Sequence, residues 1–216
     1  MYLKNIIMKK IISIIFLVVF TLSASAQEKA ITETGEVIIL YKDGTWKYQD
    51  KEDSVKTVIP VSKKIFKKDN KSSFLLKSKN VGLGFWLNPK KWSFKKATEN
   101  PQAEYEIRLK KGDLYGMLIT EKFEIPLENL KTIAYDNGKS FSPDLKIIKE
   151  EYRIVNGLKV LFMQMNGTIQ GIKFSYYGYY YSNKSGTVQF ITYTSQNLLD
   201  SYQKDCEEIL NGIVEL

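Results

Sequence analysis

Residues Asn156–Tyr193, NGLKVLFMQMNGTIQGIKFSYYGYYYSNKSGTVQFITY, carry three runs of β-branched, aromatic and long apolar side chains: 158–165, 172–181 and 187–193. Such runs between glycine-containing turns predict strands, and the short turns predict antiparallel pairing. In the first run apolar residues occupy both odd and even positions, which is typical of a strand covered on both faces. We therefore expect the centre of a two-faced sheet here. The glycines that we place in its turns are Gly167, Gly171 and Gly186.

The sequence around this stretch alternates between extended and helical patterns. Pro126 suits a first helical turn, and the apolar residues after it follow helical spacing as far as Asn137-Gly138, a typical stop. An apolar stripe over 198–210 predicts a second helix. Strands, a helix, strands and a helix together predict an α+β fold, with a mostly antiparallel sheet flanked by helices. The other extended runs are 81–87, 104–109, 114–123 and 145–155.

The first 26 residues have the pattern of a secretion signal. Lys9 and Lys10 precede the apolar run Ile11–Leu22, and Ala24-Ser25-Ala26 supplies small residues for cleavage. The apolar run is shorter than the roughly 20 residues that span a bilayer, so a membrane anchor is the less favoured alternative. We expect a mature chain that starts near Gln27 and resides in the periplasm or outside the cell, whether translation starts at Met1 or at Met8.

Residues 27–49 predict a β-hairpin. Asp43-Gly44 lies between two extended runs, and glycine accepts the positive φ that tight hairpin turns need. Trp46, directly after the turn, is a candidate ligand-binding residue, or else it covers one face of the hairpin. Because an isolated hairpin is marginal in water, we expect it to dock on the main domain, to pair with another chain or to stay mobile.

Residues 50–80 carry nine lysines and few apolar side chains, which predicts a linker between the hairpin and a main domain at 81–216. Val58, Ile59, Val61, Ile65 and Phe66 leave room for a short ordered piece within it. The linker is either a basic tether for an anionic surface, such as lipid headgroups or polysaccharide, or a solvated connection without a partner.

Charge and cysteine content exclude several roles. Without its first 26 residues the chain has 29 basic and 24 acidic side chains, and only Arg108 and Arg153 are arginines. Nucleic-acid sites favour arginine, so we expect no nucleic-acid partner. A low-GC genome would also enrich lysine without any selection for binding. Cys206 is the only cysteine, so the exported chain has no internal disulfide.

From Val81 to Leu216 the order of elements resembles the PsbP/Mog-type superfamily. The resemblance rests on the opening strand with Pro89 and Trp92, the helix after Pro126, the strands NGLKVLF and GIKFSYYGYYY, and the closing helix SYQKDCEEILNGI. It implies an antiparallel sheet between helices and a role in binding partners rather than in catalysis. The DGTWKY hairpin is similar to a short element of secreted bacterial proteins of unknown role.

Common catalytic constellations are missing from the sequence. It has no histidine, which removes Ser–His and Cys–His nucleophile systems and histidine-containing zinc sites. Cys206 falls on the apolar stripe of the last helix, where we expect a small buried hydrophobe. No glycine-rich phosphate loop is present. We therefore expect no cofactor and no metal. The carboxylates that could still converge in a hydrolase are Glu121, Glu124, Asp136 and Asp144; Glu150 and Glu151 face opposite sides of a strand.

Five tyrosines follow one another in the second central strand. Alternation places Tyr177, Tyr179 and Tyr181 on one face and Tyr176 and Tyr180 on the other. Exposed aromatic side chains would bind a sugar, a peptide or a protein; the alternative is that they pack under the helices. Our candidate ligand- or partner-binding residues are Tyr177, Tyr179, Tyr181 and Trp46.

The sequence thus favours an exported, non-enzymatic binding or assembly protein of the cell envelope, with an envelope protein or a glycan as its partner. A module that contacts a polyanion or a membrane surface through its lysine-rich linker is the first alternative. A carboxylate-dependent hydrolase is the second. The sequence predicts no particular oligomeric state.

Overall fold

In the computed structural model, the described residues are 28–32, 36–49, 58–98 and 100–216. The predicted secretion signal lies outside them. The chain divides into two units, one with residues up to Ala30 and Val37–Asp50, the other with Ile31–Glu36 and Lys51–Leu216. Within the described ranges, no helix combines the length and the apolar character that crossing a membrane requires.

The N-terminal strands form a small sheet of β1 (Glu28–Ile31), β2 (Val37–Leu40) and β3 (Trp46–Tyr48), in that order. The predicted hairpin is confirmed: β2 and β3 pair antiparallel across Asp43-Gly44, and Gly44 has a φ of +82°. The Asp43 carboxylate accepts hydrogen bonds from the Thr45 amide and hydroxyl at 2.9 and 2.6 Å, and these bonds lower the pKa of Asp43. No described residue of this sheet is buried.

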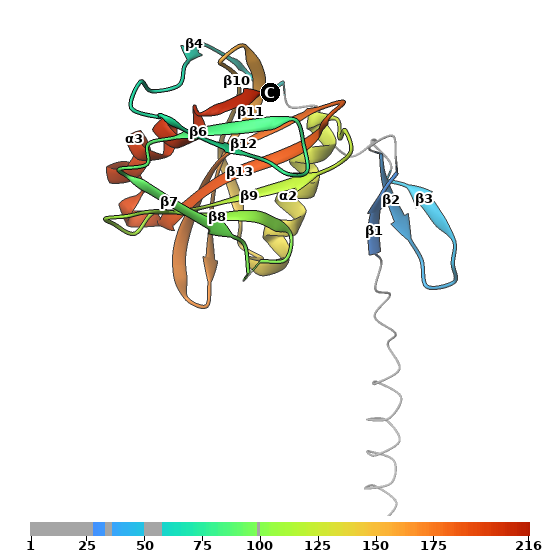
Figure 1. Ribbon diagram of the computed structural model, residues 1–216. Helices are drawn as coiled ribbons and strands as arrows, with labels where there is room; N and C mark the ends of the chain where they lie inside the picture. The colour runs from blue at the N-terminus through green and yellow to red at the C-terminus, as the bar shows by residue number, and fades with distance from the viewer. Residues whose placement is uncertain (1–27, 33–35, 50–57, 99) are drawn as a thin grey trace, which may run out of the picture. The chain divides into compact units, whose positions relative to one another are not determined.

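The main unit contains an eight-stranded sheet with the order β4-β10-β11-β12-β13-β9-β8-β7 (Figure 1). All neighbours pair antiparallel except β4, which runs parallel to β10. The strands are β4 (Val61–Phe66), β7 (Trp92–Lys96), β8 (Ala103–Leu109), β9 (Tyr115–Glu121), β10 (Lys146–Val155), β11 (Leu158–Ile169), β12 (Ile172–Asn183) and β13 (Gly186–Ser195). A smaller antiparallel sheet has the order β14-β6-β5, from β14 (Ile213–Glu215), β6 (Leu83–Leu87) and β5 (Phe74–Lys77).

Two α-helices are described in the main unit, α2 (Leu127–Phe141) and α3 (Leu199–Leu210), and they belong to different cores of the eight-stranded sheet (Figure 1). One core joins α3 and the β14-β6-β5 sheet to residues such as Phe162, Tyr179 and Phe190. The other joins α2 to residues such as Met163 and Tyr180. The predicted α+β class and the two-faced central sheet are confirmed.

Two glycines have a different role from the one that the sequence suggested. Gly138 does not end the first helix, which continues to Phe141; a Cβ at Gly138 would meet a Leu145 methyl at 2.5 Å. Gly167 is not in a turn but pairs with Phe174 inside β11, where a Cβ would meet the Ser142 hydroxyl at 2.3 Å. Both positions lack a side chain because the loop between α2 and β10 packs closely against them.

The predicted linker is ordered over its described part, and residues 50–57 lie outside the described residues. β4 and β5 fall within it, and Phe66 and Leu76 are buried in the α3 core. The predicted start of the main domain at Val81 is therefore wrong. Two buried apolar side chains among the lysines, Phe66 and Leu76, are enough to hold β4 and β5 at the edges of their sheets. Lysine is common on edge strands, where its charge discourages further pairing.

Candidate functional site

The tyrosine side chains of β12 alternate as predicted, but they do not form an exposed surface. Tyr177, Tyr179 and Tyr181 point into the α3 core and are 2%, 0% and 9% exposed. Tyr180 is buried in the α2 core, with Tyr176 packed against that core. The prediction of an open aromatic platform is wrong, because α3 and the β14-β6-β5 sheet cover these rings. The packing alternative holds.

The hydroxyl groups of the three tyrosines reach a row of polar side chains on α3 and β14. Tyr177 donates to Glu207 Oε1 at 3.0 Å, and Tyr179 donates to Asn211 Oδ1 at 2.8 Å. Tyr181 donates to Glu215 Oε1 at 2.7 Å. Burial raises the pKa of Tyr179 and of Tyr181 to about 12, so both remain hydrogen-bond donors at neutral pH.

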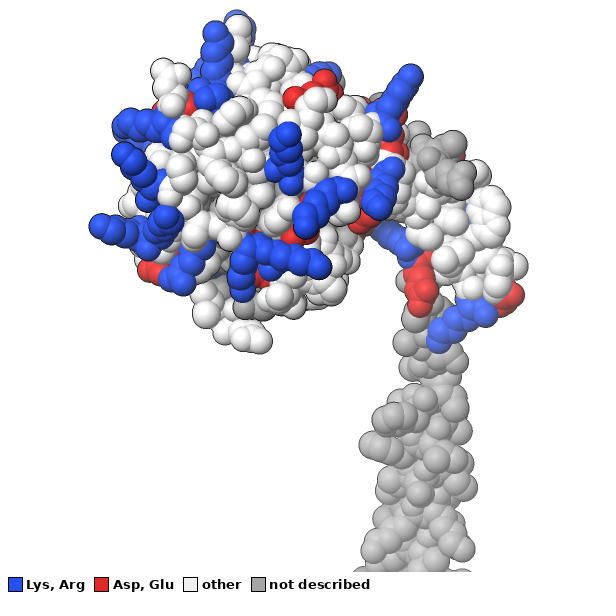
Figure 2. Space-filling view, in the orientation of Figure 1, with Lys and Arg blue, Asp and Glu red and all other residues white. Residues whose placement is uncertain are grey.

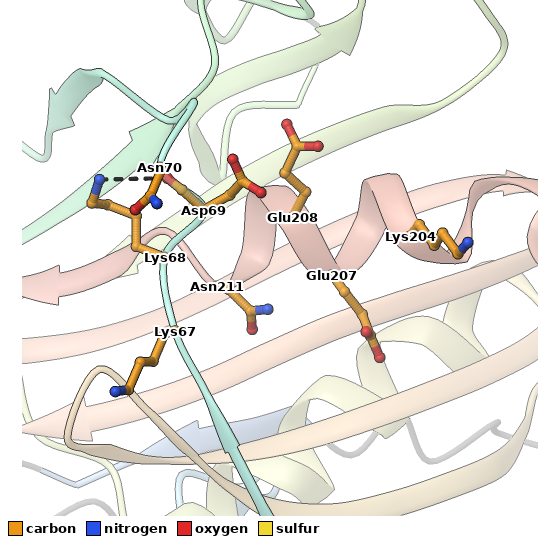
Figure 3. Close-up of a pocket in the computed structure, with 8 residues that line it drawn as sticks. All are labelled: Lys67, Lys68, Asp69, Asn70, Lys204, Glu207, Glu208 and Asn211. Atoms are coloured by element: carbon orange, nitrogen blue, oxygen red, sulfur yellow. Dashed lines mark hydrogen bonds between the residues drawn. The ribbon is translucent and has the colours of Figure 1, made fainter.

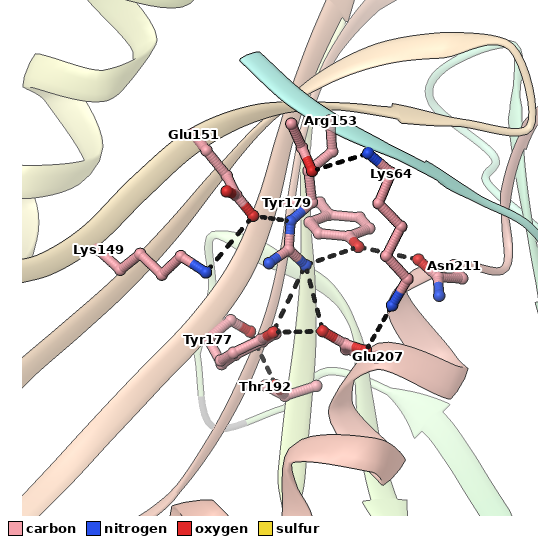
Figure 4. Close-up of polar contacts among 10 residues, drawn as sticks. Lys64, Lys149, Glu151, Arg153, Tyr177, Tyr179, Thr192, Glu207 and Asn211 are labelled. Carbon is pink, nitrogen blue, oxygen red and sulfur yellow. Dashed lines mark hydrogen bonds and ion pairs between the residues drawn. The ribbon is translucent and has the colours of Figure 1, made fainter. Parts of the chain in front are cut away.

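Arg153 of β10 lies at the centre of these contacts and is only 2% exposed (Figure 4). Its Nε donates to Glu151 Oε1 at 2.8 Å, and one terminal nitrogen donates to the hydroxyls of Tyr179 and Tyr177 at 3.2 and 3.4 Å. The same nitrogen lies 3.7 Å from Glu207 Oε1. We call Glu151, Arg153, Tyr177, Tyr179, Glu207 and Asn211 the Arg153 network.

Aromatic rings hold the Arg153 guanidinium in place. Its central carbon lies 3.7 Å from the ring centre of Phe162 and 4.5 Å from that of Phe66. Guanidinium groups bind ring faces favourably, and more strongly when water is excluded. With two nearby carboxylates and two ring faces, the buried charge of Arg153 is compensated from β4, β10, β11, β12 and α3 together.

A shallow, open pocket of about 490 Å³ lies between α3 and the loop that follows β4 (Figure 3). We call it the α3 pocket. Its lining residues are Lys67, Lys68, Asp69, Asn70, Lys204, Glu207, Glu208 and Asn211. Glu207 and Asn211 also belong to the Arg153 network, so buried tyrosine hydroxyls fix part of the pocket wall.

Some charged side chains of the α3 pocket bind partners among the residues that the structure describes, and others do not. Lys68 Nζ donates to the Ser72 carbonyl at 3.1 Å and lies 5.0 Å from the Trp86 ring centre. The Glu208 carboxylate binds Lys91 Nζ at 2.7 Å. Lys67 and Lys204 are exposed and form no ion pair with any other residue in the described part of the chain. The pocket therefore presents ammonium groups at its rim and fixed carboxylate and amide groups in its wall.

Lys91 anchors the outer side of α3. It binds Asp205 as well as Glu208. Burial alone would lower the pKa of Lys91, but the hydrogen bonds and ion pairs with the two carboxylates outweigh it and raise that pKa. The helix that forms one side of the α3 pocket is thus held on one side by Lys91 and on the other by the Arg153 network.

Cys206 and the adjacent pair Glu150 and Glu151 are the reactive side-chain types that the sequence analysis considered in this part of the fold. Cys206 of α3 is fully buried, as expected, and burial raises the pKa of its thiol to about 11. Across the described ranges, no group of three or more acidic or cysteine side chains is placed to hold a metal ion. Glu150 binds Lys131 of α2, whereas Glu151 binds Arg153, so these neighbours do face opposite sides of β10.

Trp46, the remaining predicted site residue, is 54% exposed in the N-terminal sheet. Its ring packs edge-on against Tyr48, with ring centres 5.3 Å apart. A ligand-binding role for Trp46 stays a prediction. Sequence reasoning missed Arg153, although an arginine two residues from a glutamate in the extended run 145–155 puts both side chains on one face of a strand, which is the signal that could have found the pair.

Comparison with known proteins defines the fold class. No protein-family model and no curated protein sequence matches the chain. Among solved structures, the fold is PsbP-like: the solution structure of cyanobacterial PsbP (CyanoP) from Synechocystis sp. PCC 6803 superimposes with a TM-score of 0.50 at 15% identity, over 66% of this chain and 92% of that one. This likeness confirms the fold that the PsbP/Mog-type resemblance implied.

Two further solved structures are similar at lower scores. PA94 from Pseudomonas aeruginosa, a protein of unknown function, has a TM-score of 0.43 at 9% identity, over 66% of this chain and 96% of its own. LpqN of Mycobacterium tuberculosis, described as involved in cell envelope biogenesis, has a TM-score of 0.44 at 10% identity, over 61% of this chain and 82% of its own.

Proposed function

We propose that this chain is an exported, non-enzymatic binding protein of the cell envelope and that it contacts its partner through the α3 pocket. One observation carries the proposal: the pocket wall is built on a buried, fully compensated arginine. Arg153 and the tyrosines hold Glu207 and Asn211 in fixed positions beside Lys67 and Lys204 at the rim. Preorganised polar groups lose little conformational freedom on binding, which favours affinity.

The form of the pocket favours a segment of a larger molecule as the partner. Enclosed, mostly apolar cavities are typical of small-molecule sites, whereas the α3 pocket is open and lined by charged and amide side chains. A polar segment of an envelope protein or a glycan, with both acidic and hydrogen-bonding groups, would match the lysines at the rim and the oxygens of the wall.

The experiment is crosslinking in living cells. A photo-reactive amino acid is placed at Asn70 or Lys204, which line the pocket, and, as a control, at Phe141, which is 74% exposed at the end of α2. We expect a discrete crosslinked species from the pocket positions that is absent from the Phe141 position. Equal labelling from all three positions, or none from the pocket, would contradict the proposal.

A charge reversal provides the specificity control. Lys67→Glu with Lys204→Glu should abolish the crosslinked species from position 70, because two rim ammonium groups are replaced by carboxylates. Lys146→Glu with Lys173→Glu makes the same change in net charge at exposed positions outside the pocket, and it should leave the species unchanged.

A further inference from the structure

The charges of the chain are strongly segregated along the sequence. Residues 58–112 contain 14 lysines and arginines against 4 acidic residues, whereas residues 113–216 contain 10 against 13. The first segment therefore has a net charge of +10, and the second a net charge of −3. A codon bias toward lysine would act along the whole chain, so it does not account for this difference.

The basic segment forms β4 to β8, of which β6, β7 and β8 lie on the face of the main unit that is seen in Figures 1 and 2. Figure 2 shows this face with many blue side chains and few red ones. We call it the basic face. The exposed lysines of the basic segment in or beside β5, β7 and β8 are Lys71, Lys77, Lys79, Lys90, Lys96, Lys110 and Lys111; Lys95 projects from the other side of β7 and pairs with Glu106.

Two exposed phenylalanine rings lie within the basic face. Phe74 of β5 and Phe94 of β7 are 42% and 38% exposed, with ring centres 5.3 Å apart. Lys96 follows Phe94 on the same side of β7, since side chains alternate along a strand. The backbone of Lys77 also lies beside these rings, because its carbonyl accepts a hydrogen bond at 3.4 Å from Tyr105, which itself packs against Phe94. Apolar rings are thus interspersed among ammonium groups.

This composition matches a diffuse negative surface that also accepts apolar groups. Lysine ammonium groups are flexible point charges without the fork geometry that arginine uses for a single bound anion. Proteins that lie on membranes combine such lysines with aromatic side chains that enter the headgroup region. We propose that the basic face docks on an anionic lipid bilayer, with Phe74 and Phe94 at the level of the headgroups.

The test is sedimentation of the exported protein with vesicles. Vesicles of phosphatidylglycerol in phosphatidylcholine should retain the protein at low salt and release it as salt rises, and pure phosphatidylcholine vesicles should not retain it. Lys77→Glu with Lys96→Glu should reduce partition by at least roughly 30-fold, since each lysine near such a surface contributes about fivefold. Lys146→Glu with Lys173→Glu is the matched control, and its effect should be much smaller.

A second variant separates lipid from other anions. Phe74→Ser with Phe94→Ser should weaken vesicle binding several-fold but leave retention by a soluble sulfated polysaccharide unchanged, whereas Phe141→Ser, a control at an exposed ring, should change neither. All variants carry the same N-terminal residues as the wild type, so any contribution of those residues to vesicle binding is equal in every sample. Failure of the wild-type protein to bind anionic vesicles would overturn the proposal. So would a phenylalanine variant that binds vesicles like the wild type. Neither result bears on the α3 pocket.

Discussion

At the residue scale, the outstanding feature is one buried arginine whose partners come from five elements, β4, β10, β11, β12 and α3. The side chain of Arg153 is 3% exposed, and its guanidinium meets Glu151, Glu207, two tyrosine hydroxyls and two phenylalanine rings. Removing one partner of a buried ion pair leaves the other charge buried without a counter-charge. This destabilises a protein far more than the loss of an exposed surface ion pair does.

We predict that Arg153→Met lowers the free energy of unfolding by about 3 kcal/mol, because Glu151 and Glu207 would lose their buried counter-charge. The control is Arg108→Met: the only other arginine is exposed and lies 5.3 Å from the Tyr115 ring, so its loss should cost less than about 1 kcal/mol. Urea unfolding followed by circular dichroism measures both. Equal midpoints for the two variants would show that the Arg153 network contributes little.

Alkaline pH should destabilise the protein through its buried tyrosines. Burial raises the pKa of Tyr179 to about 12, whereas a tyrosine in the unfolded chain ionises near pH 10. Between these values the unfolded chain binds fewer protons than the folded one, so stability is complete below about pH 10 and falls as pH rises toward 12.

The measurement is the urea midpoint at pH 8, 10 and 11. We expect a steep fall above pH 10 for the wild type and a shallower one for Tyr179→Phe, which has no hydroxyl to ionise. Identical slopes for the two proteins would mean that Tyr179 does not contribute to the alkaline transition.

Cys206 should be chemically silent in the folded protein. It is fully buried in α3, and burial raises the pKa of its thiol to about 11, so little thiolate is present at pH 8. We predict labelling by a thiol reagent at the rate of unfolding and complete labelling in urea. Rapid stoichiometric labelling without denaturant would contradict the burial of the α3 stripe.

At the element scale, the turn between β10 and β11 connects three parts of the main unit. Asn156 has a positive φ of 51°, and its side-chain amide donates to the carbonyls of Asn211 and Ile213, both at 2.8 Å. Its side-chain oxygen accepts from the Lys68 amide at 2.9 Å. One turn residue therefore joins the loop of the α3 pocket to the end of α3 and to β14.

Asn156→Gly separates these contacts from the conformation of the turn, since glycine tolerates the positive φ. We predict a loss of about 2 kcal/mol, since three hydrogen bonds disappear at roughly 1 kcal/mol each and glycine recovers part of the turn strain. The control is Gln170→Gly in the next hairpin, where φ is 50°. That change should be neutral or slightly stabilising. Unfolding of both variants in guanidinium chloride measures the two losses of stability, and similar losses would contradict the connecting role of Asn156.

Element prediction from the sequence succeeded where one local pattern dominated and failed where tertiary contacts did. The central strands and α3 follow from alternation and from a helical stripe. β4 was anticipated only as a short ordered piece of the linker because its average charge is high, and only its pairing with β10 and the burial of Phe66 hold it in the sheet. The sequence predicted a helix end at Gly138, since glycine is common where helices stop. The reason for a glycine there is the close approach of the Leu145 side chain, which cannot be read from the sequence.

At the scale of the whole molecule, the α+β fold could be predicted but the site could not. The tyrosines of β12 were assigned to the right faces, yet whether a face is open depends on which layer covers it. Apart from Glu151, the members of the Arg153 network come from β12, from α3 and from Asn211 directly after it, 24 to 58 positions from Arg153 in sequence, and no local pattern links them to Arg153. The charge segregation, in contrast, is visible in the sequence once the lysines of 58–80 are counted with the domain.

The most direct test of the account is the yield of crosslinked partner from a photo-reactive residue at Lys204, compared with that from Phe141, in cells that export the protein. Binding through the α3 pocket predicts one dominant adduct with the probe at position 204 and none with the probe at position 141. Lys67→Glu should abolish the adduct whether the probe is at position 70 or at position 204. An adduct at position 141 of equal yield, or an adduct at 204 that is indifferent to Lys67→Glu, would contradict it.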